Sequence, residues 1–126
     1  MSQRLPITRW LAFLPAAAWS ALLLYIGRRD FGTGPESWWM PPDKLLHFVL
    51  YGVLGALLGS GWHAAGRRPS PALIVAAGAL AGLYDEWYQQ FVPTRSSDAL
   101  DWIADGLGIL AGFLLIAALQ RRQTPR

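Results

Sequence analysis

Four apolar runs of nearly membrane-spanning length constrain the fold of this 126-residue chain more than any other feature. A helix needs roughly 17 to 25 mostly apolar residues to cross a bilayer. The chain is 53% apolar and carries charge at only 15% of its positions, below the roughly 25% of soluble domains. We therefore expect one all-α membrane domain over residues 1–126, a bundle of four transmembrane helices at about 10–26, 45–62, 71–91 and 99–119.

The first run must be distinguished from a cleaved signal peptide, because Arg4 and Arg9 precede it and Ala16-Ala17-Ala18 lies within it. The apolar stretch before that small-residue site, Trp10 to Leu14, is shorter than the roughly 7 to 15 residues of a signal-peptide core. Apolarity then continues to Ile26. We expect an uncleaved first helix.

The distribution of basic residues predicts the orientation of the bundle. With the N-terminus in the cytoplasm, the cytoplasmic segments hold seven Lys and Arg residues against four outside, and the eight acids all lie outside. Cytoplasmic segments of membrane proteins are enriched in Lys and Arg. We expect both termini in the cytoplasm of a bacterial cell, in the inner membrane.

Polar residues gather in three segments that this topology places at one depth, just beneath the outer headgroups. They are Asp43 to Phe48, Tyr84 to Asp98 and Asp101 to Gly106. Ionisable groups at membrane depth are costly and are a functional-site hypothesis by default. At helical spacing they form stripes that should face the bundle interior: Asp43, His47 and Tyr51; Glu86 and Gln90; Asp85 and Gln89; Asp98, Asp101 and Asp105.

Small residues four positions apart predict where helices approach closely. The pairs are Gly55 and Gly59, Gly78 and Gly82, and Gly108 and Gly112. Such spacing allows helix backbones to come together within a membrane.

The polar segments, taken in order, resemble the VanZ-like family of small bacterial membrane proteins. The resemblance rests on Asp43-Lys44-Leu45-Leu46-His47-Phe48, on Glu86 with Gln90, on Phe91-Val92-Pro93-Thr94-Arg95 and on Asp101 before the glycine-rich helix. It covers about residues 43–112. Two positions depart from the family pattern, since Thr94 stands where glycine is usual and Asp105 where asparagine is usual. The second departure adds a possible charge to the polar site.

The resemblance implies where the protein lies and the kind of process in which it takes part. The name-giving member of the family is associated with low-level resistance to teicoplanin, a glycopeptide that acts on cell-wall precursors at the outer membrane surface. It implies no particular reaction, and whether this chain is an enzyme stays open.

Two roles are open for the central residues. Arg95 suits bidentate binding of phosphate or carboxylate, or it forms an ion pair that fixes the turn before the last helix. His47 is either a packing residue or a general base held by Glu86 or Asp101. Our candidate catalytic residues are His47, Glu86 and Asp101, and our candidate ligand-binding residues are Lys44, Tyr51, Asp85, Gln90, Arg95 and Asp105.

Other classes of site have weaker support. Glu86, Asp101, Asp105 and His47 could offer ligands to a hard divalent cation, but no spacing matches a recognised metal motif, and we assign no metal residue or cofactor. The chain lacks cysteine, which excludes thiolate chemistry, and its net charge of +3 is too small to indicate nucleic acid as a partner.

These features are consistent with two functions that belong to different classes. In the first, the site opens to the outer leaflet and binds an anionic lipid head group of the cell envelope, such as that of a polyprenyl-linked intermediate. In the second, the polar residues form an internal ion-pair lock, that is, a set of ion pairs that holds the helices of a non-catalytic accessory subunit together.

Overall fold

The computed structural model describes residues 6–27, 43–66, 70–91 and 99–123, and every regular element in this part of the chain is an α-helix. The elements are α1 (Pro6–Leu11), α2 (Leu14–Gly27), α3 (Asp43–Ala64), α4 (Pro71–Gln89) and α5 (Ala99–Gln123). The predicted all-α fold class is confirmed.

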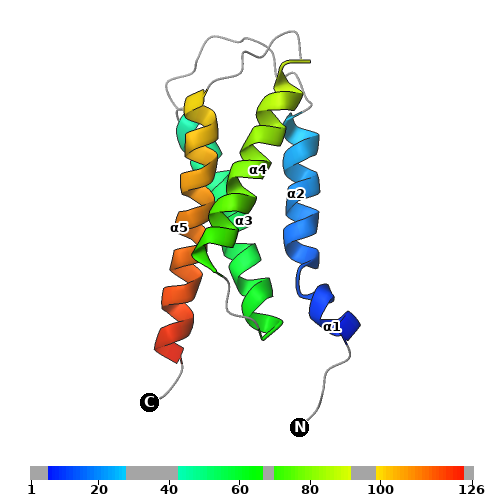
Figure 1. Ribbon diagram of the computed structural model, residues 1–126, viewed down its shortest axis with the longest axis vertical. Coiled ribbons are helices and arrows are strands. Elements are labelled where there is room, and N and C mark those ends of the chain that lie inside the picture. The colour runs from blue at the N-terminus through cyan, green and yellow to red at the C-terminus, as the bar shows by residue number, and fades with distance from the viewer. Residues whose placement is uncertain (1–5, 28–42, 67–69, 92–98, 124–126) are drawn as a thin grey trace.

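The four long helices lie side by side and alternate in direction along the chain. In Figure 1, α2 and α4 run upward, whereas α3 and α5 run downward. The α1 helix and the last turn of α5 therefore lie at the same end of the bundle. Because α3 and α5 run in the same direction, they pack as a parallel pair.

Three stretches in the described residues are long and apolar enough to cross a membrane. They are Arg9–Ile26, Leu45–Ala64 and Trp102–Gln123, with mean hydropathies of 1.4, 1.6 and 2.0. Helix α4 is 19 residues long but is not among them. Its last two turns carry the polar sequence from Tyr84 to Gln89.

The predicted first helix is in fact two helices. Helix α1 ends at Leu11 and α2 begins at Leu14, and the turn between them is closed by a bond from the Phe13 amide to the Trp10 carbonyl, 3.0 Å long. Pro15 explains the break, because its ring would clash with the carbonyl of Leu11 in a continuous helix and its nitrogen has no proton to donate.

Helices α3 and α5 approach so closely that their backbones touch through glycines. A Cβ atom on Gly112 would collide with the Gly52 carbonyl, and one on Gly108 would collide with the Phe48 carbonyl. From the other helix, a Cβ on Gly55 would collide with the Ile109 carbonyl. The predicted close approach at Gly55 and at the Gly108 and Gly112 pair is confirmed.

Helix α4 packs on α5 through the predicted pair Gly78 and Gly82. A Cβ on Gly78 would lie 3.3 Å from the Ile109 side chain, and one on Gly82 would collide with the indole of Trp102. That indole donates from Nε1 to the Ala79 carbonyl at 3.1 Å. Ile109 is only 1% exposed and packs against α3 on one side and α4 on the other.

Helix α2 is joined to α3 by a second indole hydrogen bond. Trp19 donates from Nε1 to the Leu50 carbonyl at 2.9 Å. Neither tryptophan bond was foreseen from the sequence. Among the described residues, the buried cluster between the helices comprises Ala16, Tyr51, Leu54, Ile109 and Phe113.

The outer surface of the bundle is apolar, as a membrane helix requires. Leu80 is 67% exposed, Leu107 54% and Leu115 58%. Side chains of this kind, on three different turns of α4 and α5, are suited to contact lipid rather than water.

Candidate functional site

The centre of the candidate site is a buried contact between His47 of α3 and Asp105 of α5. Nδ1 of His47 lies 2.8 Å from Oδ1 of Asp105. The two side chains are 11% and 2% exposed, respectively. A buried polar group is costly unless it has a hydrogen-bond partner. Each residue supplies one for the other.

The local sequence of each helix explains why these side chains meet. On α5, Trp102, Asp105 and Ile109 lie three and four residues apart, so they share the face that packs against the rest of the bundle. On α3, His47 is one turn before Tyr51, which is 8% exposed. The glycine contact between α3 and α5 lies just below and brings the two backbones close enough for a short aspartate to reach the imidazole.

Apolar and aromatic groups close the deeper side of the pair. The rings of His47 and Tyr51 are parallel within 4°, with centroids 6.4 Å apart. Ile109, one turn below Asp105, is among the most buried side chains of the described residues. Tyr51 and Ile109 thus lie on the side of the pair that faces the middle of the bundle.

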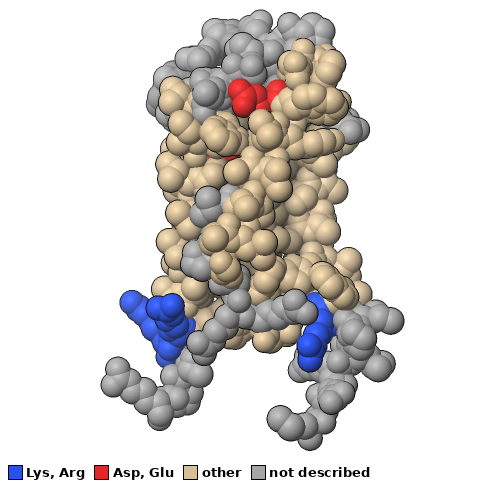
Figure 2. Space-filling view, in the orientation of Figure 1, with Lys and Arg blue, Asp and Glu red and all other residues tan. Residues whose placement is uncertain are grey.

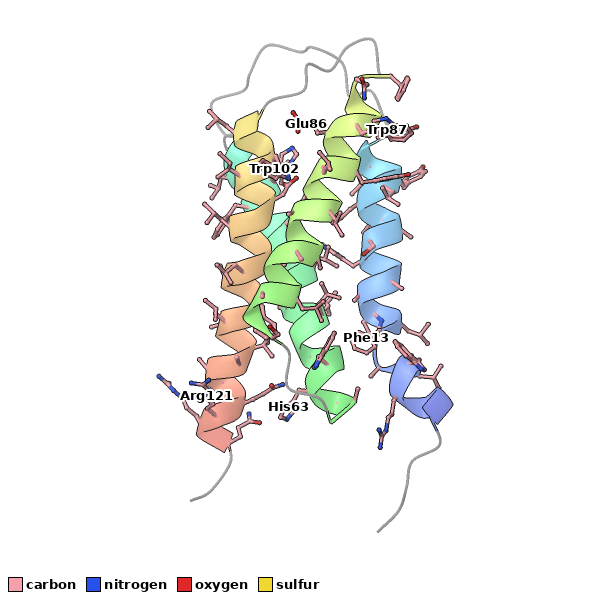
Figure 3. The ribbon with its side chains drawn as sticks, viewed as in Figure 1. Phe13, His63, Glu86, Trp87, Trp102 and Arg121 are labelled. Atoms are coloured by element: carbon pink, nitrogen blue, oxygen red, sulfur yellow. The ribbon has the colours of Figure 1, made fainter. Side chains whose placement is uncertain are left out.

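Glu86 lies at this same end of the bundle, on α4. It follows Gly78 and Gly82 at four-residue spacing, and both glycines face α5. Glu86 therefore continues the α5-facing stripe, about 6 Å beyond Gly82 at 1.5 Å per residue. Its side chain is half-buried. In Figure 3 it lies at the same end as Trp102, and Arg121 and His63 lie at the opposite end.

The described charges are separated between the two ends. Figure 2 shows arginine at the lower end and acid near the upper end of the bundle. Arg9 lies in α1, and Arg121 and Arg122 lie in the last turn of α5. Glu86 and Asp105 belong to the other half.

The structure brings some of the predicted site residues together and leaves others undescribed. His47, Asp105 and Tyr51 are in one cluster, and Glu86 is near its end of the bundle. Gln90 is exposed and its Nε2 donates to the carbonyl of Trp87 in the same turn, at 2.8 Å. The side chains of Lys44, Asp85 and Asp101 are not described, and Arg95 lies outside the described residues.

The structure identifies one carboxylate in contact with His47 that the sequence did not single out as its partner. The sequence favoured Glu86 or Asp101 as the partner, whereas the structure places Asp105 at hydrogen-bond distance. Both Asp101 and Asp105 belong to the predicted stripe of α5. That Asp105 reaches the imidazole depends on the register of α5 against α3, which the glycine contacts set and which no single helix reveals.

A metal site has no support from the described side chains. No three His, Asp or Glu residues gather among them in a group that could hold a metal ion. The contact of one imidazole with one carboxylate instead suits hydrogen bonding and proton transfer.

Comparison with known proteins gives one family. The family model described as VanZ/LLP1 matches residues 4–120, which is nearly the whole chain. No curated protein and no solved structure matches.

Proposed function

The chain belongs to the VanZ/LLP1 family, and from that premise we propose that it is a four-span protein of the bacterial inner membrane that binds an anionic lipid head group. Both termini lie in the cytoplasm. The end of the bundle that holds His47, Asp105 and Glu86 faces the outer leaflet. The ligand is the phosphate-bearing head of a lipid-linked cell-envelope intermediate.

The charge separation supports this orientation. Arg9, Arg121 and Arg122 lie at one end of the described bundle. Since cytoplasmic ends of membrane proteins are rich in arginine and lysine, this end belongs in the cytoplasm. The opposite end, with its acids, then belongs at the outer surface.

Helix α4 serves as the fourth span in this proposal. Its 19 residues extend for about 28 Å at 1.5 Å per residue, close to the roughly 30 Å of hydrocarbon. The residues up to Leu83 cross the apolar region, and the polar turns that follow lie in the headgroup layer. This position brings Glu86 to the membrane surface.

The single observation that carries the proposal is the buried pair of His47 and Asp105, 2.8 Å apart and in the half of the bundle where α3 and α5 begin. Ionisable groups are expensive inside a membrane, and they usually mark a ligand or proton pathway. Lys44 in the first turn of α3 and Arg95 between α4 and α5 would supply positive charge for a phosphate. A role in glycopeptide resistance would follow if the ligand is a cell-wall precursor.

Mass spectrometry of co-purifying lipids tests the proposal. Wild type, Arg95→Ala and Arg121→Ala are purified gently in parallel, the last as a control that removes an arginine from the other end. We expect a phosphate-bearing lipid enriched on wild type and on Arg121→Ala, and lost from a folded Arg95→Ala. The same bulk lipids on all three proteins would argue against Arg95 as a ligand-binding residue.

A second candidate, the accessory subunit with an internal lock, is favoured by the burial of the pair, since Asp105 is only 1% exposed. Conservative variants separate the two. If the site binds a ligand, Glu86→Gln loses the lipid without losing abundance, because it leaves the buried pair of His47 and Asp105 intact. If the pair is only a lock, His47→Asn lowers abundance and detergent stability along with any function, and Glu86→Gln changes little.

A further inference from the structure

We propose that Asp105 is a positioning residue that holds His47 in the tautomer with its proton on Nδ1, so that Nε2 is the proton-accepting atom of the site. The functional meaning of this inference rests on the proposed binding site. The tautomer itself is a property of the folded chain and can be measured without any ligand.

The contact distance and the chemistry of the two groups lead to this assignment. At 2.8 Å, Nδ1 and Oδ1 share one hydrogen. An ionised carboxylate can only accept hydrogen bonds, whereas a neutral imidazole has one nitrogen that donates and one that accepts. With an ionised Asp105, the nitrogen that faces it must carry the proton. The lone pair of the neutral ring is then on Nε2.

The packing around the pair keeps the ring in this orientation. Asp105 is 1% exposed, and its backbone is fixed by the glycine contacts one turn away at Gly108. The parallel ring of Tyr51 lies one turn further along α3. A ring that turned over would move Nδ1 away from the carboxylate and leave a buried charge without this partner, which is costly.

A fixed Nε2 lone pair gives His47 a defined chemical role. Nε2 can accept a proton from a ligand hydroxyl or from a protonated phosphate, and the carboxylate of Asp105 compensates the positive charge that the ring then gains. An aspartate that holds a histidine in this way acts by orientation and electrostatics, and does not itself need to take up the proton. Asp105 would touch no ligand.

Aspartate and asparagine at position 105 should differ in how they hold the His47 ring. Asparagine has the same shape, but its amide can either accept a hydrogen through oxygen or donate one through nitrogen. Asparagine at this position would therefore allow the proton of His47 on either ring nitrogen. An ionised aspartate allows only one arrangement.

Nitrogen NMR of the histidine ring tests the inference. The chain has only two histidines, His47 and His63, and His63 is exposed at the other end. A His63→Gln protein labelled with ¹⁵N-histidine therefore gives signals from His47 alone. Spectra are recorded in lipid at about pH 9, well above the ordinary histidine pKa of about 6.5.

We expect a proton on Nδ1 and none on Nε2 in the protein with Asp105, and a measurable population with the proton on Nε2 in Asp105→Asn. Glu86→Gln, which removes the other described acid at this end, should leave the spectrum of His47 unchanged. Wild-type Nδ1 without a proton would overturn the inference, and so would protons on both nitrogens at this pH. A spectrum that changes in Glu86→Gln but not in Asp105→Asn would also overturn it.

The wild-type spectrum alone decides the tautomer if Asp105→Asn does not fold. The outcome is also independent of the lipid measurement. A protein that keeps the Nδ1 proton but enriches no lipid would refute the proposed function and leave this inference standing. A protein that enriches the lipid but carries the His47 proton on Nε2 would refute this inference and leave the proposed function standing.

Discussion

Nδ1 of His47 lies 2.8 Å from Oδ1 of Asp105, although 58 positions of sequence separate the two residues. The contact joins two parallel helices, α3 and α5, directly beside the place where their glycines bring the backbones together. The polar pair and the glycine contact therefore depend on one register between the helices. A substitution that disturbs either contact should therefore weaken the other.

Breaking the pair from one side should destabilise the fold. Asp105→Ala leaves a buried imidazole without this partner, and we expect a loss of about 1–3 kcal/mol in the free energy of unfolding. The double variant with His47→Ala should be less destabilised than the sum of the two single losses. The difference, which is the coupling free energy, should be up to about 2 kcal/mol, as for polar pairs in other membrane helices. Unfolding in mixed micelles measures all four proteins.

His63→Ala is the matched control for this cycle, because His63 is exposed at the opposite end of the bundle. Its effect should stay within about 0.5 kcal/mol. Additive losses from the two single variants at 47 and 105 would mean that the pair contributes no interaction energy.

The glycine contact between α3 and α5 gives a second prediction. A methyl group at position 112 would collide with the Gly52 carbonyl, which is backbone and cannot move aside alone. We expect Gly112→Ala to cost about 1–3 kcal/mol, the usual range for overpacking. It should also weaken the coupling between His47 and Asp105, because α3 and α5 must separate.

Gly106→Ala is the control for that experiment, since a Cβ at position 106 of the same helix meets nothing within 4 Å. Alanine is the better helix former by about 0.5–1 kcal/mol. The stability of Gly106→Ala should therefore be unchanged or higher. Equal losses at 106 and 112 would contradict the packing described here.

The indole of Trp102 should contribute to the contact of α4 with α5 through its hydrogen bond. Trp102→Phe keeps an aromatic ring but loses the bond from Nε1 to the Ala79 carbonyl, and we expect a loss of about 0.5–1.5 kcal/mol. Trp87 is 55% exposed and its ring contacts Tyr84 and Phe91 within α4 and at its end. Trp87→Phe should cost less than about 0.5 kcal/mol, and a larger loss there than at Trp102 would refute this assignment.

The sequence was sufficient to predict the long helices and the inward faces of α3 and α5, but not that of α4, where Gln90 is exposed. Apolar length identified α3 and α5, and four-residue spacing placed His47, Tyr51 and Asp105 on interior stripes because polar groups avoid lipid. The same spacing identified the glycines that contact neighbouring helices. These features are local, and each helix carries its own signal for them.

Contacts between helices were harder to predict, because they depend on register. Asp105 meets His47 because of the register that the contacts of Gly108 and Gly112 with α3 impose, and this register cannot be read from either helix alone. The bonds of Trp19 and Trp102 to backbone carbonyls of other helices have no local signature either. The break before α2 could have been predicted from the sequence, since Pro15 disfavours a continuous helix.

Cysteine labelling of the two ends tests most directly the central claim that the polar end of a four-span bundle faces outward. The chain has no cysteine, so Gln90→Cys, Gln123→Cys and Ser70→Cys each introduce one thiol, all at exposed positions. We expect a membrane-impermeant thiol reagent to label Gln90→Cys in cells with a permeabilised outer barrier and an intact inner membrane. The other two should react only after the inner membrane is opened. Labelling of Gln123→Cys but not Gln90→Cys in intact cells would contradict the orientation, and equal labelling of Ser70→Cys and Gln90→Cys would contradict the crossing of α4.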